Sequence, residues 1–167
     1  MLKKQYEKKQ LERGWRIVLL IWGAILASLG IYIGVCWSIR EDIQINVSPD
    51  FPLETLQYIL VGVTVITLVA VYYLRKFLLR PTNVTSNAEK YSSAQQLALN
   101  KYTATMVVTS ALVESIAIYG VVLFFLSKDI SSLYQLSFMS AVAMIYFRPR
   151  KSELLDLVTK IEKQCKL

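Results

Sequence analysis

The sequence contains no histidine and only two cysteines, four prolines and six glycines among its 167 residues. Histidine is the usual general base and a frequent metal ligand near neutral pH, so its absence argues against hydrolases, metalloenzymes and haem proteins. A nucleophile elbow, a phosphate-binding loop and a cofactor motif are also missing. We therefore predict a protein that is not an enzyme and that binds no metal, cofactor or small-molecule substrate.

Hydrophobic residues are abundant instead, making up 54% of the chain with a mean hydropathy of +0.42. A soluble domain holds roughly 45–50% apolar residues, mixed with polar ones. Here the apolar residues form long blocks and the charges lie between the blocks. This pattern excludes a disordered tail, a disulfide scaffold and an ordinary soluble domain, and it predicts a membrane protein.

Four apolar blocks are candidate membrane spans. A helix needs about 20 mostly apolar residues to cross a hydrocarbon core of about 30 Å. The blocks cover about 15–38, 56–74, 102–126 and 130–147, and the last is the shortest. The first is longer than the roughly 7–15 apolar residues of a signal peptide, so we expect an uncleaved span. The sequence thus predicts an all-α integral membrane protein with four transmembrane helices.

The charges between the blocks predict the orientation. Residues 1–16 hold six Lys/Arg and two acids, and the first loop, about 39–55, holds one Arg and four acids. The second loop, about 75–102, has five bases and one acid, and the tail from Arg148 has six bases and three acids. Because basic loops stay in the cytoplasm, we expect both termini and the second loop to be cytoplasmic.

The net charge of +7 follows largely from this topology. The bases flank apolar spans and no aromatic-rich soluble platform accompanies them, so we expect no binding to nucleic acid. Contact with anionic lipid headgroups is favoured, at about 1 kcal/mol per nearby Lys or Arg. The partners that we expect are therefore the lipid bilayer and other membrane subunits or further copies of the chain.

Three parts follow from these observations: a basic cytoplasmic segment over 1–14, a four-span membrane domain over 15–147 and a cytoplasmic amphipathic helix over 148–167. The first segment has two interpretations of equal weight, a helix lying along the headgroups before it turns into the membrane, or a solvated tail.

The second loop contains signals for the end of one helix and the start of another. Pro81 stops the second span, and Ser86 precedes Glu89 at capping-box spacing. Good helix formers follow, with no Gly or Pro before Gly120. We predict one helix over about 87–126, about 60 Å long at 1.5 Å per residue, which extends the third span into the cytoplasm.

The tail has apolar residues at helical spacing, namely Leu154, Leu157, Val158, Ile161 and Cys165. This face has to meet lipid headgroups, the chain's own bundle or a partner. It carries aliphatic groups and no Trp or Phe anchor, which favours a protein surface.

Small residues recur along one side of the first span and along the third. In lipid, small residues allow helix backbones to approach closely. We therefore predict helix-packing seams at Gly23, Ala27, Gly30, Gly34, Ala111 and Gly120.

Glu114 is the single charged residue within the third block. A charge at mid-membrane costs a few kcal/mol, so we expect this carboxyl to be buried and largely protonated at pH 7. Candidate hydrogen-bond partners are Ser110 on the same face and Thr64 and Thr67 across a helix pair. Two roles remain open: a proton or cation site, or a structural bond between helices of about 0.5–2 kcal/mol.

Residues 111–122, Ala-Leu-Val-Glu-Ser-Ile-Ala-Ile-Tyr-Gly-Val-Val, resemble the outer helix of the rotary ATP synthase subunit c, the proteolipid, and Thr105-Met106 upstream is also similar. The resemblance implies a mid-membrane carboxylate, Glu114, that carries H⁺ or Na⁺ around a ring. It also implies an ion site with Ser115 and Tyr119. Ile116 holds the position where sodium-binding members have a hydroxyl, which favours H⁺.

The second span departs from the proteolipid because it has one Gly in place of a glycine ladder. The layout of four spans with an acid in the third also resembles the small membrane assembly factor of ATP synthase called protein I. These resemblances imply a bacterial cytoplasmic membrane. We therefore expect a non-catalytic accessory subunit of a larger membrane complex, built around a proteolipid-like hairpin. The alternative is a proton-translocating subunit, or an ATP-synthase-related assembly factor, in which Glu114 exchanges.

Overall fold

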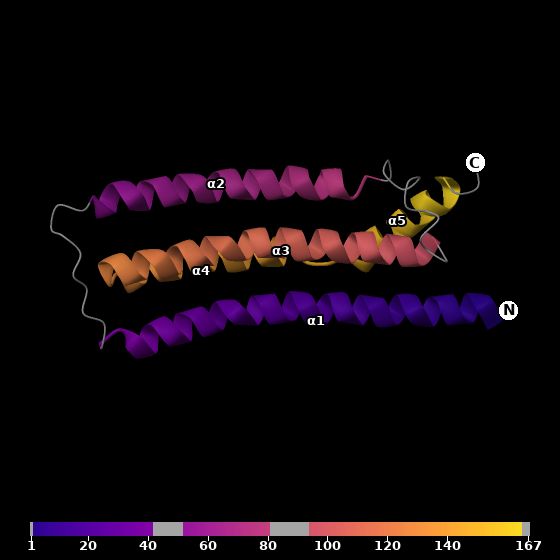
Figure 1. Cartoon of the computed structure of the whole chain (residues 1–167), viewed down its shortest axis with the longest axis horizontal. Coiled ribbons are helices and arrows are strands. Elements are labelled where there is room, and N and C mark those ends of the chain that lie inside the picture. The colour runs from indigo at the N-terminus through magenta and orange to yellow at the C-terminus, as the bar shows by residue number, and fades with distance from the viewer. Residues whose placement is uncertain (1, 42–51, 81–93, 165–167) are drawn as a thin grey trace. The chain divides into compact units, whose positions relative to one another are not determined.

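The computed structural model describes residues 2–41, 52–80 and 94–164, and within these ranges every regular element is a helix. The helices are α1 (Leu2–Ile39), α2 (Leu53–Leu78), α3 (Ala94–Ser127), α4 (Ile130–Tyr146) and α5 (Lys151–Gln164) (Figure 1). The predicted all-α fold is confirmed for this part of the chain.

Three helical segments are long and apolar enough to cross a membrane: Lys9–Ile39, Leu53–Leu78 and Gln95–Ser127. With 17 residues, α4 is about 25 Å long, and it reaches the length of a span only together with α5. The described residues thus contain three candidate spans, or four if α4 and α5 together form one.

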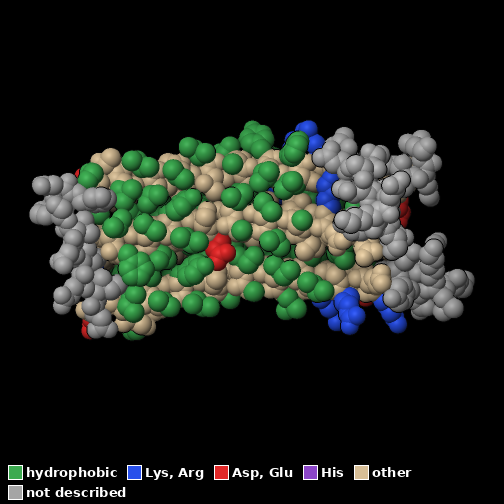
Figure 2. Space-filling view, in the orientation of Figure 1, with side chains coloured by type: hydrophobic (Ala, Val, Ile, Leu, Met, Phe, Trp, Pro, Cys, Tyr) green, Lys and Arg blue, Asp and Glu red, His purple; other side chains and the backbone are tan. Residues whose placement is uncertain are grey.

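The surface of these helices is apolar. Many large hydrophobic side chains are exposed, including Leu20 at 72%, Tyr58 at 77% and Ile66 at 69%. Figure 2 shows hydrophobic side chains covering much of the face in view. A soluble monomer rarely exposes such extended apolar surface, whereas helices solvated by lipid tails do, so these helices are compatible with an integral membrane protein.

The basic N-terminal segment belongs to the first helix. From Leu2 to Ile39 α1 is continuous, so there is no break at which residues 2–14 could turn into the membrane. Gly14 lies inside this helix, and a Cβ at this position would clash with the Leu99 side chain. The absence of a side chain therefore allows α1 and α3 to approach closely at this level.

A tight connection joins α3 to α4. Lys128 has a φ of 57°, and its N–H donates to the Phe124 carbonyl at 2.9 Å, which ends α3 in a left-handed cap. Asp129 then caps α4 by accepting hydrogen bonds from the backbone N–H groups of Ser131 and Ser132. Two residues are thus enough to reverse the chain.

The predicted helix over 87–126 corresponds to α3, which ends at Ser127 and whose described part begins at Ala94. The proposed cap at Ser86 and the stop at Pro81 lie outside the described residues. Pro149 follows α4, and its ring disfavours helical backbone at the preceding Arg148, which separates α4 from α5.

The chain divides into two compact units. Unit 1 comprises 1–23, 73–109 and 148–167, and unit 2 comprises 24–72 and 110–147. In unit 1, the apolar face of α5 packs into a core with α1 and α3. The buried members of this core are Val18, Leu97, Ala98, Tyr102, Met106, Leu154, Leu157, Val158 and Ile161. Of the three environments open to this face, its own bundle covers Leu154, Leu157, Val158 and Ile161, and Cys165 lies outside the described residues.

In unit 2, α3 lies between α1 and α2 (Figure 1). Phe124 of α3 packs with Cys36 of α1 and Leu133 of α4. A second cluster consists of Ile116 and Leu123 of α3 and Leu136 of α4. Three leucines of α2 pack against it, namely Leu56, Leu60 and Leu68. As a result, the acid-bearing helix contacts all three other helices of unit 2.

Candidate functional site

The carboxyl group of Glu114 on α3 is held by two hydroxyl groups of α1. Its Oε1 accepts hydrogen bonds from Ser28 Oγ at 2.5 Å and from Tyr32 OH at 2.7 Å. Ser28 and Tyr32 are four residues apart, so both hydroxyls lie on one face of the helix. These are the only hydrogen bonds to Glu114 among the described side chains, and they join α1 to α3 within the apolar part of unit 2.

The Ser28 hydroxyl has a second acceptor. Its Oγ lies 2.6 Å from the carbonyl oxygen of Ile25 on the same helix. A hydroxyl has one proton to donate and two lone pairs to accept, so Ser28 donates to Glu114 or to Ile25, and not fully to both. When Ser28 donates to Ile25, its Oγ can accept the acid proton of Glu114. The site therefore satisfies its hydrogen bonds with the carboxyl ionised or protonated.

Glu114 is half-buried, whereas we expected it to be buried. Figure 2 shows acidic surface in the midst of hydrophobic side chains. Since Ser28 and Tyr32 both reach Oε1, the second carboxyl oxygen receives no hydrogen bond from the described residues.

The threonine partners that we expected from α2 lie elsewhere. Thr64 is fully buried, but its Oγ1 donates to the Leu60 carbonyl at 2.9 Å. Thr67 donates to the Val63 carbonyl at 2.8 Å. A threonine in a helix can donate its hydroxyl proton to the carbonyl four residues earlier, so neither hydroxyl donates to Glu114, and neither is hydrogen-bonded to Glu114 among the described residues.

The expected partners on α3 also differ. Ser110 is buried at 5% exposure, without a hydrogen bond to Glu114 in the described part of the chain. Ser115 Oγ donates to the Leu112 carbonyl at 2.8 Å. Tyr119 packs against the apolar cluster of Ile116, Leu123 and Leu136. The resemblance to the proteolipid implied an ion site at Ser115 and Tyr119, and neither hydroxyl hydrogen-bonds to Glu114 among the described residues.

Sequence reasoning missed Ser28 and Tyr32. A signal was present, because these are two hydroxyl-bearing residues four positions apart near the middle of the first apolar block. In such a block a hydroxyl pair on one helical face indicates a polar partner on another helix. We had instead expected α2 to pack beside Glu114 and to provide Thr64 and Thr67 as its partners.

The small residues predicted to pack divide into two groups. A Cβ added to Gly120 would lie 3.2 Å from Leu136 Cβ and 3.3 Å from the backbone of Leu133, so Gly120 forms the α3–α4 seam. Ser140 Oγ reinforces this seam by donating to the Val113 carbonyl at 2.8 Å. Ala111 is exposed.

The other group lies on α1. A Cβ added to Gly23, Gly30 or Gly34 would meet no atom of the described residues within 4 Å, and Ala27 is exposed. We call these four residues the α1 stripe. At 3.6 residues per turn, the stripe lies roughly opposite Ser28 and Tyr32 on the helix. It is therefore an open, narrow face that points away from Glu114.

Unit 1 contains a second polar cluster. Arg75 Nη2 lies 2.7 Å from Glu153 Oε2, with the arginine side chain 9% exposed. The backbone N–H of Arg150 donates to Tyr102 OH at 2.9 Å. In the described part of the chain, no group of three His, Cys, Asp or Glu side chains is placed to hold a metal ion.

No protein family, curated protein or solved structure matches the chain.

Proposed function

We propose that this chain is a non-catalytic subunit of a larger membrane complex, and that it binds a transmembrane helix of a partner through the α1 stripe. We place it in a bacterial cytoplasmic membrane, which it crosses with four spans. Both termini lie in the cytoplasm in this proposal, because the basic loops alternate with acidic ones. In this proposal Glu114 is a protonated structural group that holds α1 on α3.

The observation that carries the proposal is the two-sided character of α1. On its inner face, the hydroxyls of Ser28 and Tyr32 donate hydrogen bonds to Glu114. These bonds set the rotation of the helix about its axis. Its outer face presents Ala27, Gly30 and Gly34, which are all exposed in the described part of the chain; an added Cβ at either glycine would meet no described atom within 4 Å. Helices in lipid associate through close backbone packing at small residues, so an open stripe of this kind suits a partner helix.

Two glycines allow a matched test. Gly30 on the stripe and Gly62 on α2 are both exposed, and within the described ranges an added Cβ at either position would meet no atom within 4 Å. We expect Gly30→Leu to release the partner, because the larger side chain holds the backbones apart, and we expect Gly62→Leu to retain it. The measurement is the native mass of the complex extracted from membranes, with helical content as a check on folding.

A wild-type chain that extracts as a lone monomer would contradict the proposal. So would a complex that survives Gly30→Leu as well as it survives Gly62→Leu, since the stripe would then not be the contact. If both variants lose the complex, any larger side chain on a lipid-facing helix disrupts it. This result would also contradict a contact that is specific to the stripe.

A second function is favoured by the arrangement of Ser28. Because its hydroxyl can turn between Glu114 and the Ile25 carbonyl, the site accommodates both protonation states without leaving the hydroxyl unbonded. A half-buried carboxyl with this property suits proton exchange, as the resemblance to the proteolipid also implies. Under this alternative Glu114 loads and unloads a proton at mid-membrane.

Glu114→Gln separates the two functions. The amide keeps an oxygen that accepts from Ser28 and Tyr32, but it cannot release a proton at neutral pH. A structural role predicts an intact complex with unchanged proton flux across vesicles that contain it. Proton exchange predicts an intact complex whose flux falls to the level of empty vesicles.

A further inference from the structure

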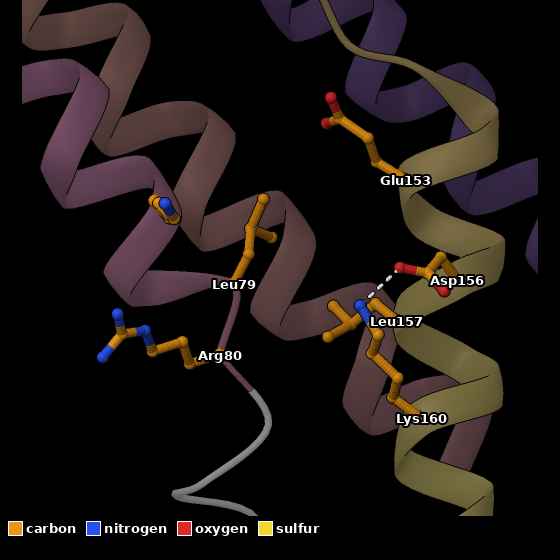
Figure 3. Close-up of a pocket in the computed structure, with 7 residues that line it drawn as sticks. Leu79, Arg80, Glu153, Asp156, Leu157 and Lys160 are labelled. Atoms are coloured by element: carbon orange, nitrogen blue, oxygen red, sulfur yellow. Dashed lines mark hydrogen bonds and ion pairs between the residues drawn. The ribbon is translucent and has the colours of Figure 1, made fainter.

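A groove of about 380 Å³ lies in unit 1 between the end of α2 and α5 (Figure 3). Five charged side chains and two leucines line it: Lys76 from α2, Leu79 and Arg80 directly after α2, and Glu153, Asp156, Leu157 and Lys160 from α5. This size falls within the range of sites for small molecules, about 300–1,000 Å³. The groove therefore has the volume and the amphipathic lining for a charged group attached to an apolar body.

Both acids of the groove are already compensated. Lys160 Nζ lies 2.6 Å from Asp156 Oδ2, the bond drawn in Figure 3. Glu153 accepts from Arg75 Nη2 at 2.7 Å. Because each carboxylate has a cation beside it, neither is left to repel an anion that enters the groove.

Two cations at the end of α2 have no acid beside them in the described part of the chain. Lys76 and Arg80 are exposed, and no acid pairs with either of them among the described side chains. Lys101 adds a third positive charge, since its Nζ donates to the backbone carbonyl of Arg80 at 2.5 Å. The groove as a whole favours an anion.

The exposed aromatic residues of α2 indicate the level of the groove. Tyr72, Tyr73 and Phe77 are 50%, 65% and 60% exposed, and they precede Arg80 by three to eight residues. Aromatic side chains gather where hydrocarbon meets headgroups, and Lys and Arg lie just beyond them. Because α2 is a candidate span, the groove opens at the headgroup layer, where the abundant anions are lipid phosphates.

We propose that the groove between α2 and α5 binds the phosphate of an anionic phospholipid, with Lys76 and Arg80 as its cations and Leu79 and Leu157 against the glycerol and upper acyl region. The acyl chains continue along the exposed side of α2. Such a lipid would connect α5 to the membrane and is independent of the partner proposed for the α1 stripe.

The test uses the purified full-length chain in detergent, with native mass spectrometry to count bound lipids during titration with phosphatidylglycerol or phosphatidylcholine. We expect one phosphatidylglycerol to bind in preference to phosphatidylcholine. In the double variant Lys76→Gln/Arg80→Gln its affinity should fall roughly 25-fold, from about 1 kcal/mol per cation and tenfold for every 1.4 kcal/mol. Lys9→Gln/Arg13→Gln on α1 is the control, because both side chains are also exposed, and it should retain the bound lipid.

Three outcomes would overturn the proposal: equal binding of both lipids, an equal loss in the α1 control, or unchanged binding in the groove variant. Glycerol phosphate serves as a soluble probe, and binding of it as tight as that of the lipid would assign the groove to a soluble phosphate. If the double variant fails to fold, the single exposed change Arg80→Gln replaces it, with about a fivefold loss expected from about 1 kcal/mol.

Discussion

The bond between Tyr32 and Glu114 can be measured with a double-mutant cycle. Tyr32→Phe removes one hydroxyl and keeps the ring, and Glu114→Leu removes the carboxyl and keeps an apolar side chain of similar length. The cycle is needed because Glu114→Leu alone also removes the cost of placing a polar group in lipid, so its single effect does not report the bond.

The distances set the expected size of the coupling. Tyr32 OH is 2.7 Å and Ser28 Oγ is 2.5 Å from the same Oε1, both within the range of O–H···O hydrogen bonds. Side-chain hydrogen bonds between membrane helices contribute about 0.6 kcal/mol on average and at most about 1.7. We expect a coupling of about 1 kcal/mol, less than the sum for two bonds because Ser28 still donates to the carboxyl in Tyr32→Phe.

The assay is reversible unfolding in mixed micelles, followed by the loss of helical circular dichroism in the four proteins of the cycle. Tyr58→Phe is the control, since its side chain is 77% exposed and should show no coupling with Glu114→Leu. A Tyr32–Glu114 coupling below about 0.3 kcal/mol, which is the usual error of additivity, would refute the assignment of this bond as a stabilising contact between α1 and α3.

Two further predictions concern the connections around α3. Gly120→Ala should destabilise the chain by about 1–3 kcal/mol relative to Gly62→Ala, because the new Cβ crowds the α4 backbone while Gly62 has open space; equal unfolding free energies would contradict the tight seam. The hydroxyl of Ser132 and two backbone N–H groups bond the Asp129 carboxylate and hold the pKa of Asp129 below its ordinary 3.8. Asp129→Ala should therefore cost about 1 kcal/mol at neutral pH. A carboxyl whose pKa is lowered by folding stabilises the folded state above its ordinary pKa and loses this effect below it. The destabilisation by Asp129→Ala should therefore shrink as the pH falls below about 4. Unfolding free energies measured from pH 7 to pH 3 test this, and a destabilisation that stays constant over this range would contradict it.

The positions of the helices could be predicted from the sequence because they depend on local properties. The apolar blocks ending at 38 and 126 correspond to helices ending at Ile39 and Ser127. The amphipathic spacing of the tail likewise predicted α5. Which surface covers its apolar face was not predictable, since lipid, a partner and the chain's own core all satisfy the same periodicity. In the structure, Tyr102 and Met106 of α3 help to cover it.

The sequence by itself determined that a carboxyl group would lie in the middle of an apolar helix and that it would need polar company. Only the tertiary structure decided which hydroxyls provide it. Thr64 and Thr67 satisfy themselves on their own helix, whereas Ser28 and Tyr32, 86 and 82 residues away from Glu114, reach its Oε1. Which hydroxyls reach Glu114 depends on the rotation of α1 about its axis and on its packing against α3. Neither can be derived from the residue spacing within a single helix.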